Sequence, residues 1–182
     1  IMGILLVIGI IIGTLIAIIL IGGLLVPKHY VFEKSMHIKA SRDKVWTQLN
    51  NFGSLVKWMP WMRMDPLMES GIDGQDGTAG AKYWWNGNKQ VGEGSMTFKS
   101  FNAPEKTVID LQFLKPFKSK ALTTLKAVPD GLGTNVTWAM EGDTPYPMNF
   151  ISKVIFNMEK YLDKDFGAGL SNLKEICEDK NF

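Results

Sequence analysis

The sequence predicts an α+β domain in which a curved antiparallel sheet wraps around a long C-terminal helix, with one transmembrane helix in front of it. Three observations support this fold class. The chain begins with an unbroken apolar run, its middle alternates apolar and polar residues between turn signals, and its end carries an apolar stripe at helical spacing. Strands followed by a long helix can bury their apolar faces against each other in two layers.

The apolar run covers residues 1–26 and contains no charged side chain and only one polar side chain, Thr14. A helix of this length can cross a hydrocarbon layer of about 30 Å, whereas a secretory signal has a shorter apolar region and a cleavage site of small residues. We therefore expect a single-pass transmembrane helix over residues 1–26 and a folded domain over residues 27–182.

Small residues recur within this predicted helix, because Gly9, Gly13 and Ala17 are four positions apart. This spacing lets a second membrane helix approach closely, so a membrane-protein complex is a candidate partner. The side of the membrane stays undecided. Positive residues follow the run, which favours a cytoplasmic domain, but the sequence opens on Ile1 and lysines upstream of it would reverse the inference.

The domain is expected to begin with a strand over residues 30–38, where apolar and polar side chains alternate. Ser41 is suited to cap a following helix. The apolar residues of that helix recur at spacings of three and four, at Val45, Trp46, Leu49 and Phe52. A break at Gly53 separates it from a second short helix over residues 56–59.

An antiparallel meander is predicted from about residue 71 to residue 142. Its turn signals are Asn86 with Gly87, residues 102–104, Lys115 with Pro116, and residues 129–131. A final amphipathic helix is expected over residues 150–176, where one apolar stripe runs without a break. The stripe consists of Phe150, Ile151, Val154, Ile155, Met158, Tyr161, Leu162, Phe166, Leu170, Leu173 and Ile176.

Five short segments in this order resemble the START-like, or SRPBCC, superfamily with the helix-grip fold. The resemblance is specific to its polyketide cyclase/dehydrase-like branch with an N-terminal membrane segment, and it covers about residues 28–178. The segments are IKASRDKVW at 38–46, KWMPW at 57–61, WWNGNK at 84–89, GTNVTW at 133–138 and GLSNLK at 169–174. The resemblance implies a deep hydrophobic pocket, ligands that range from lipids and sterols to polyketides and hormones, and enzymatic activity in a minority of members.

In each predicted strand every second residue is apolar, and these residues identify an inner face of the sheet directed at the last helix. With two residues of that helix, the candidate ligand-binding residues are Met96, Phe98, Ile109, Leu111, Phe113, Thr123, Leu125, Val136, Trp138, Met140, Met158 and Leu162. Only Thr123 and the indole N–H of Trp138 could orient a polar head group there. A lined pocket and a filled core remain alternatives, because periodicity does not distinguish them.

No catalytic residue, metal site or cofactor is expected. His29 lies beside the predicted membrane helix. His37 alternates with the apolar residues of its strand and therefore points outward, so neither histidine is positioned to act as a general base in a pocket. Cys177 shares an apolar helical face, which favours a structural role. Glu93 and Asp143 keep an enzymatic alternative open, because neighbouring glycines could form a bulge that turns a carboxylate inward.

The segment over residues 58–68 is rich in tryptophan and methionine, which suits either a pocket lid facing the bilayer or packing over the core. The 20 basic and 18 acidic residues are scattered, which argues against a nucleic-acid partner. The leading hypothesis is a membrane-anchored, non-catalytic binding protein for a hydrophobic small molecule or lipid. The alternatives are an accessory subunit of a membrane complex and a polyketide cyclase/dehydrase-like enzyme.

Overall fold

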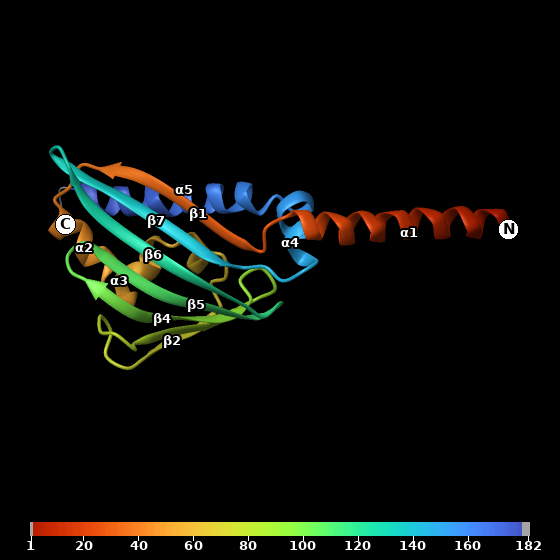
Figure 1. Ribbon diagram of the computed structural model, residues 1–182. Helices are drawn as coiled ribbons and strands as arrows, with labels where there is room; N and C mark the ends of the chain where they lie inside the picture. The colour runs from red at the N-terminus through yellow and green to blue at the C-terminus, as the bar shows by residue number, and fades with distance from the viewer. Residues whose placement is uncertain (1, 180–182) are drawn as a thin grey trace.

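The computed structural model describes residues 2–179, and within them a curved antiparallel sheet packs against a long C-terminal helix, as the sequence predicts (Figure 1). The strands are β1 (His29–Ile38), β2 (Glu69–Asp73), β3 (Lys82–Asn86), β4 (Glu93–Asn102), β5 (Lys106–Lys115), β6 (Ser119–Asp130) and β7 (Gly133–Asp143). The helices are α1 (Met2–Leu25), α2 (Arg42–Leu49), α3 (Phe52–Trp58), η1 (Pro60–Arg63), α4 (Met148–Phe150), η2 (Ile151–Ile155) and α5 (Met158–Glu178).

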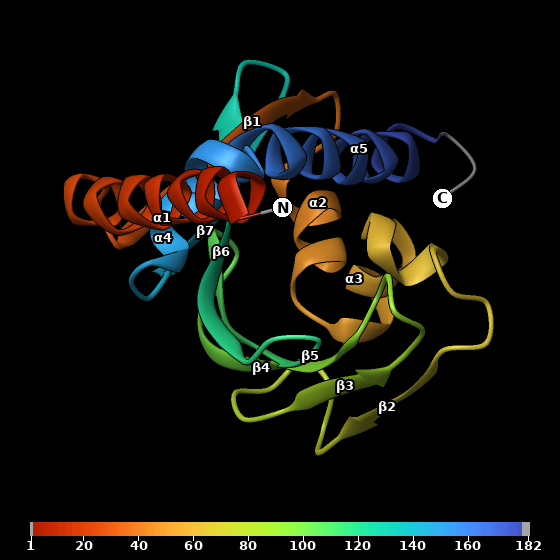
Figure 2. The same cartoon turned by 90° about the vertical axis from the view of Figure 1, so that its right-hand side faces the viewer.

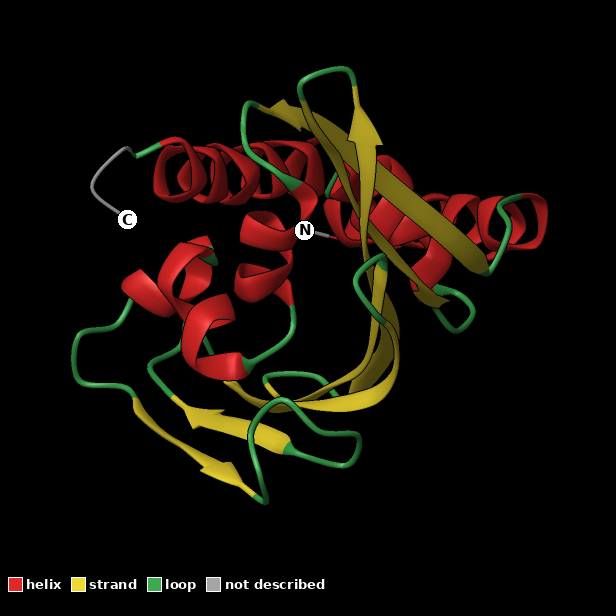
Figure 3. Cartoon of the chain, turned by 90° about the vertical axis from the view of Figure 1, so that its left-hand side faces the viewer, coloured by secondary structure: helices red, strands yellow, loops and turns green. Residues whose placement is uncertain are grey.

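The strands lie in the order β1-β7-β6-β5-β4-β3-β2, and every pair is antiparallel. The strands β2 to β7 form a meander with the predicted turns, and β1 completes the sheet beside β7. The helices α2, α3 and α5 lie on the concave side of the sheet (Figures 2 and 3). The concave side is therefore the place where the core and any enclosed site must form.

Local capping explains why α2 and α3 are separate helices. The Ser41 hydroxyl accepts a hydrogen bond from the Lys44 N–H at 3.3 Å, as the sequence predicts for the start of α2. The Asn51 side chain accepts from the Ser54 N–H at 2.8 Å and caps α3. The break therefore falls before Phe52 and not at Gly53, because the asparagine side chain offers the backbone an alternative partner.

The C-terminal apolar stripe is not one helix over residues 150–176, and that prediction was wrong. Asn157 has a left-handed backbone with φ of 47°, and its side chain accepts a hydrogen bond from the Lys160 N–H at 3.4 Å. Asparagine tolerates this conformation and caps the helix that follows it. The helix α5 thus starts at Met158, and α4 and η2 form a separate turn that leaves the sheet (Figure 1).

The helix α1 projects away from the sheet and is the one helix within residues 2–179 that is long and apolar enough to cross a membrane (Figure 1). Its end is held by the turn that contains α4. The Asn149 side-chain amide donates to the carbonyl oxygens of Gly23 at 2.8 Å and Val26 at 2.7 Å. The Tyr146 hydroxyl donates to the Leu20 carbonyl at 3.2 Å. The bond to Gly23 satisfies a carbonyl group that a helix C-terminus otherwise leaves without a partner.

Candidate functional site on the concave face of the sheet

The predicted inner face is the observed inner face. Nine of the twelve candidate residues are buried, namely Met96, Phe98, Ile109, Thr123, Leu125, Val136, Trp138, Met140 and Leu162. Leu111 and Phe113 on β5 are half-buried and pack against the same core. Met158 is 44% exposed, because it belongs to the first turn of α5, just after the break at Asn157.

The part of this face around Trp138 is filled by aromatic rings. Trp138 stacks on Phe166 of α5 with ring centroids 4.0 Å apart, and Trp58 meets its edge at 5.2 Å. The absence of a side chain at Gly169 makes this contact possible, because a Cβ atom there would come within 2.7 Å of the Trp138 ring. This half of the interior is therefore close-packed core.

The other half of the inner face is less covered. Phe113 pairs with Ser119 across β5 and β6, and Ala121 pairs with Gly142 across β6 and β7. Because β7 leads directly to the turn that holds α1, half-buried Leu111 and Phe113 and exposed Met158 lie toward the end of the domain from which α1 projects. The partly covered apolar surface is thus at the α1 end.

Few polar groups face this interior. The indole N–H of Trp138 is buried and has no hydrogen-bond partner within residues 2–179. Buried donors in proteins nearly always have a partner, so this indole is an exception within the close-packed aromatic cluster. At the α1 end, burial raises the pKa of Tyr30, and the negative charge of Asp143 raises it further. The Tyr30 hydroxyl therefore keeps its proton at neutral pH.

The candidate acids and bases lie at the surface. The His29 Nδ1 atom is 3.0 Å from the Asp143 carboxylate, and both side chains are exposed. The predicted irregularity at Glu93 exists, since the β4–β5 register shifts there. The Glu93 carboxylate nevertheless pairs with the Lys115 ammonium at 2.6 Å. His37 is exposed as predicted, and its ring Nε2 lies 3.2 Å from the Asp130 carbonyl oxygen.

The tryptophan- and methionine-rich segment over residues 58–68 is divided between core and surface. Trp58 and Met59 are fully buried, and the Trp61 indole donates to the Asp165 carboxylate of α5 at 2.9 Å. Met64 and Leu67 are exposed. The segment therefore packs η1 against α5 over the core, and its exposed apolar residues lie in the connection that follows η1.

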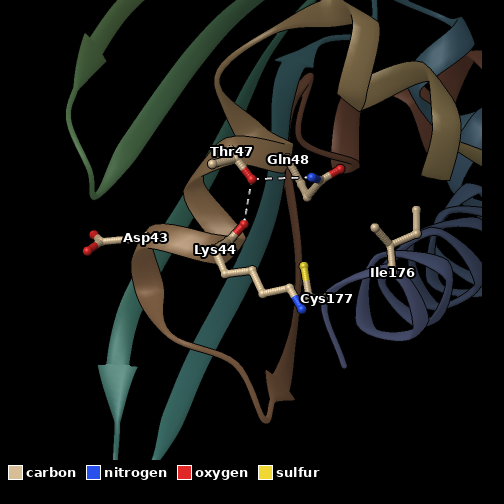
Figure 4. Close-up of a pocket in the computed structure, with 6 residues that line it drawn as sticks. All are labelled: Asp43, Lys44, Thr47, Gln48, Ile176 and Cys177. Carbon is tan, nitrogen blue, oxygen red and sulfur yellow. Dashed lines mark hydrogen bonds between the residues drawn. The ribbon is translucent and has the colours of Figure 1, made fainter. Parts of the chain in front are cut away.

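A separate groove of about 410 Å³ lies between α2 and α5 (Figure 4). It is lined by Asp43, Lys44, Thr47, Gln48, Ile176 and Cys177. Burial raises the pKa of the Cys177 thiol to about 11, so the thiol is protonated at neutral pH and is a poor nucleophile. Cys177 belongs to the hydrophobic core, which agrees with the structural role predicted for it.

The sequence model of a family described as "Polyketide cyclase / dehydrase and lipid transport" matches residues 29–178, which include the whole sheet and α5. The chain belongs to this family. The match agrees with the resemblance inferred from the five sequence segments. A search of curated proteins found no match.

Solved structures with the family's fold cover most of this chain. Truncated norcoclaurine synthase from Thalictrum flavum has a TM-score of 0.62 at 16% sequence identity, over 84% of this chain and 96% of that one. A Nitrosospira multiformis protein has a TM-score of 0.60 at 17% identity, over 84% and 99%. A Chromobacterium violaceum protein has a TM-score of 0.59 at 13% identity, over 82% and 98%. At these identities the comparison establishes the fold alone.

The contact between α1 and the turn around α4 was missed by the sequence reasoning. The ring of Phe150 lies directly against Gly22, where a Cβ atom would collide with it. The pair Gly22 and Gly23 at the end of the apolar run was the available signal, because adjacent glycines let another backbone or ring approach closely. The small-residue stripe predicted within α1 has no such contact. No other residue within 2–179 lies within 4 Å of a Cβ atom placed at Gly9 or Gly13.

Proposed function

We propose that this protein is a membrane-anchored binding protein for a hydrophobic small molecule or lipid. In this proposal residues 1–26 cross the bilayer once and residues 27–182 form the binding domain. The observation that carries it is the apolar concave face of the sheet, which is only partly covered by α5 at the α1 end, where Leu111 and Phe113 are half-buried.

The lining of this face favours an apolar ligand. Leu111, Phe113 and Met140 present aliphatic, aromatic and thioether groups, which bind through apolar area and impose little directionality. A polar head could be oriented by the Tyr30 hydroxyl at the α1 end of the face. The family to which the chain belongs includes lipid transport in its description, which is consistent with this ligand class.

An anchor has a direct consequence for such a ligand. Hydrophobic molecules concentrate in the bilayer, and a tether holds the binding face near them at a high effective concentration. The bonds from Asn149 and Tyr146 to the end of α1 would also limit how far the domain can turn on its anchor.

The test is native mass spectrometry of the full chain released from detergent, with a search for co-purified small molecules. The Leu111→Lys variant places a charge on the inner face, and Gln112→Lys places the same charge on the exposed outer face of the same strand. We expect a lipid-like adduct in the wild type and in Gln112→Lys, and its loss in Leu111→Lys. An adduct that survives in Leu111→Lys, in a protein with wild-type circular dichroism, would contradict binding on this face.

The accessory-subunit alternative rests on the exposed small residues of α1. Replacing Gly9 and Gly13 with leucine would block a close helix contact without touching the domain, because both positions are open in the structure. Loss of a co-purified membrane complex in this variant, together with an empty wild-type domain, would favour the alternative over ligand binding.

A further inference from the structure

Two of the segments outside α1 that expose large apolar side chains are the β5–β6 turn and the chain around the break before α5. Phe117 in the turn is 76% exposed, and Tyr161 on the first turns of α5 is 65% exposed. We call this set the interfacial rim, and it consists of Phe117, Val154, Ile155, Phe156, Met158 and Tyr161. Folded domains seldom leave several large apolar residues together in water, so such a patch marks an interaction surface.

Both segments lie at the end of the domain from which α1 projects. The β5–β6 turn follows the pairing of Phe113 with Ser119, at the end of the sheet where β1 begins and β7 ends. The residues 154–156 lie at the end of η2, which directly follows α4, and α4 is bonded to the end of α1 through Asn149. Figure 1 shows α4, the start of α5 and the β5–β6 hairpin all on the side that faces α1.

The charged side chains near the interfacial rim are mostly positive. Lys115, Lys118 and Lys120 surround Phe117, and the acidic partner among them is Glu93, which pairs with Lys115. Lys153 and Lys160 flank the second segment, and Glu159 pairs with Lys153 at 3.7 Å, which leaves Lys160 in excess. Lysine beside aromatic and aliphatic residues is the composition of segments that lie in the interface of an anionic bilayer.

The length of α1 places the interfacial rim at the depth of the membrane–water interface. Its 24 residues span about 36 Å, which exceeds a hydrocarbon layer of about 30 Å, so the last turn of α1 reaches the interface. Gly22 and Gly23, where the turn around α4 docks, lie in that last turn. The rim is therefore continuous with the helix that enters the membrane.

We propose that the interfacial rim inserts into the head-group layer of the bilayer that α1 enters, with its lysines beside anionic lipid head groups. This inference rests on the anchoring role of α1 in the proposed function. It adds a second point of membrane contact, and it places the partly covered end of the concave face, at Phe113 and Met158, directly over the lipid. An apolar ligand would then pass between bilayer and protein without crossing water.

The experiment uses the full chain in nanodiscs that contain phosphatidylcholine and phosphatidylglycerol. A single cysteine is introduced as Ile155→Cys or Phe117→Cys and labelled with an environment-sensitive fluorophore. Lipids that carry a nitroxide on the acyl chain serve as quenchers. Leu132→Cys is the matched control, because Leu132 is a fully exposed apolar residue in the β6–β7 turn at the opposite end of the sheet. Ile12→Cys reports on α1 itself.

We expect quenching and a blue-shifted emission at Ile155, Phe117 and Ile12, and neither at Leu132. The wild type should remain unlabelled, because Cys177 is buried. Quenching at Ile12 without quenching at Ile155 and Phe117 would overturn the rim proposal and leave the anchor intact. Absence of quenching at Ile12 would overturn the anchor and the rim together.

Two further outcomes separate the bilayer from other partners. A blue shift at Ile155 without quenching by lipid nitroxides would mean that protein covers the rim, and it would overturn the proposal. Weaker quenching at Phe117 in nanodiscs of phosphatidylcholine alone is expected from the surrounding lysines. Equal quenching in both lipid mixtures would overturn the role assigned to those lysines.

Discussion

Single buried polar groups in this domain differ in whether they have a partner. Thr107 is fully buried, and its hydroxyl donates to the Leu49 carbonyl at 2.9 Å, which ties β5 to the end of α2. Thr123 is also buried, on β6, but no side-chain hydrogen bond found within residues 2–179 joins it to another element. The two threonines thus have the same burial but different roles, since one joins elements and the other lines the concave face.

Replacing each threonine with valine should separate these roles. Thr107→Val leaves the Leu49 carbonyl buried without its donor and should lower the free energy of unfolding by about 1–3 kcal/mol. Thr123→Val removes a hydroxyl that joins no other element, and it should change the free energy of unfolding by less than about 0.5 kcal/mol. Urea denaturation of the full chain in detergent measures both. Equal losses in the two variants would contradict the assignment.

The Cys177 thiol makes the stability of the domain depend on pH in the alkaline range. Its pKa is raised to about 11 in the folded chain, so the folded state favours the neutral thiol. The stabilising contribution is complete below the pKa of the unfolded chain, near 8.5, and is lost as the pH rises through about 11.

We therefore expect the free energy of unfolding of the wild type to fall between about pH 9 and pH 11 relative to Cys177→Ala, by roughly 2 kcal/mol. Alanine keeps a small apolar side chain and removes the titrating group. Parallel stability curves for the two proteins over this range would show that burial does not hold the thiol neutral.

Among the elements, α5 shows how two glycines in one helix can serve opposite purposes. At Gly169 a side chain would strike the Trp138 ring, which is packed against the helix. At Gly167 the nearest group is the flexible ammonium end of Lys34, 3.3 Å from the position that a Cβ atom would take. Lys34 itself bonds to the Asp163 carboxylate at 2.5 Å and joins β1 to α5. Close packing therefore requires glycine at position 169 and does not require it at position 167.

The two alanine variants should change stability in opposite directions. Gly167→Ala should raise the free energy of unfolding by about 0.5–1 kcal/mol, because alanine is the better helix former and Lys34 can move aside. Gly169→Ala should lower it by about 1–3 kcal/mol, because the Trp138 ring must shift within a packed aromatic cluster. Thermal denaturation followed by circular dichroism checks both, and stabilisation by Gly169→Ala would show that the cluster is loosely packed.

At the scale of the whole molecule, the contact between α1 and the turn around α4 decides how the domain is oriented relative to α1. Asn149, Tyr146 and Phe150 supply this contact, and Gly22 accepts the Phe150 ring. A side chain at Gly22 is therefore incompatible with the observed position of the ring, whereas one at Gly13 meets nothing within 4 Å among residues 2–179.

We expect Gly22→Ala to accelerate amide hydrogen exchange over residues 146–150 of the full chain in nanodiscs, by about tenfold if the contact contributes roughly 1.4 kcal/mol. Exchange in β6 and β7 should be unchanged, because the sheet does not depend on this contact. Gly13→Ala is the matched control and should resemble the wild type. The same acceleration in both variants would point to a general effect on α1.

Much of the fold and of the candidate site was predictable from local pattern. The two-residue alternation identified the inner face, because a strand that covers a core must turn its apolar side chains inward, as Phe98, Ile109 and Val136 do. The turn residues identified the meander, and Ser41 identified the start of α2. The apolar run predicted a helix because an unbroken sequence of aliphatic residues leaves no signal for a turn.

The break at Asn157 and the covering of the inner face were decided only by the tertiary structure. An apolar stripe has the same period whether it faces a core or another surface, so periodicity could not show that Val154, Ile155 and Phe156 leave the sheet. Which part of the concave face is filled depends on contacts between distant segments, such as Trp138 with Phe166. The sequence by itself determined which faces are apolar, and the packing of those segments decided which of them are covered.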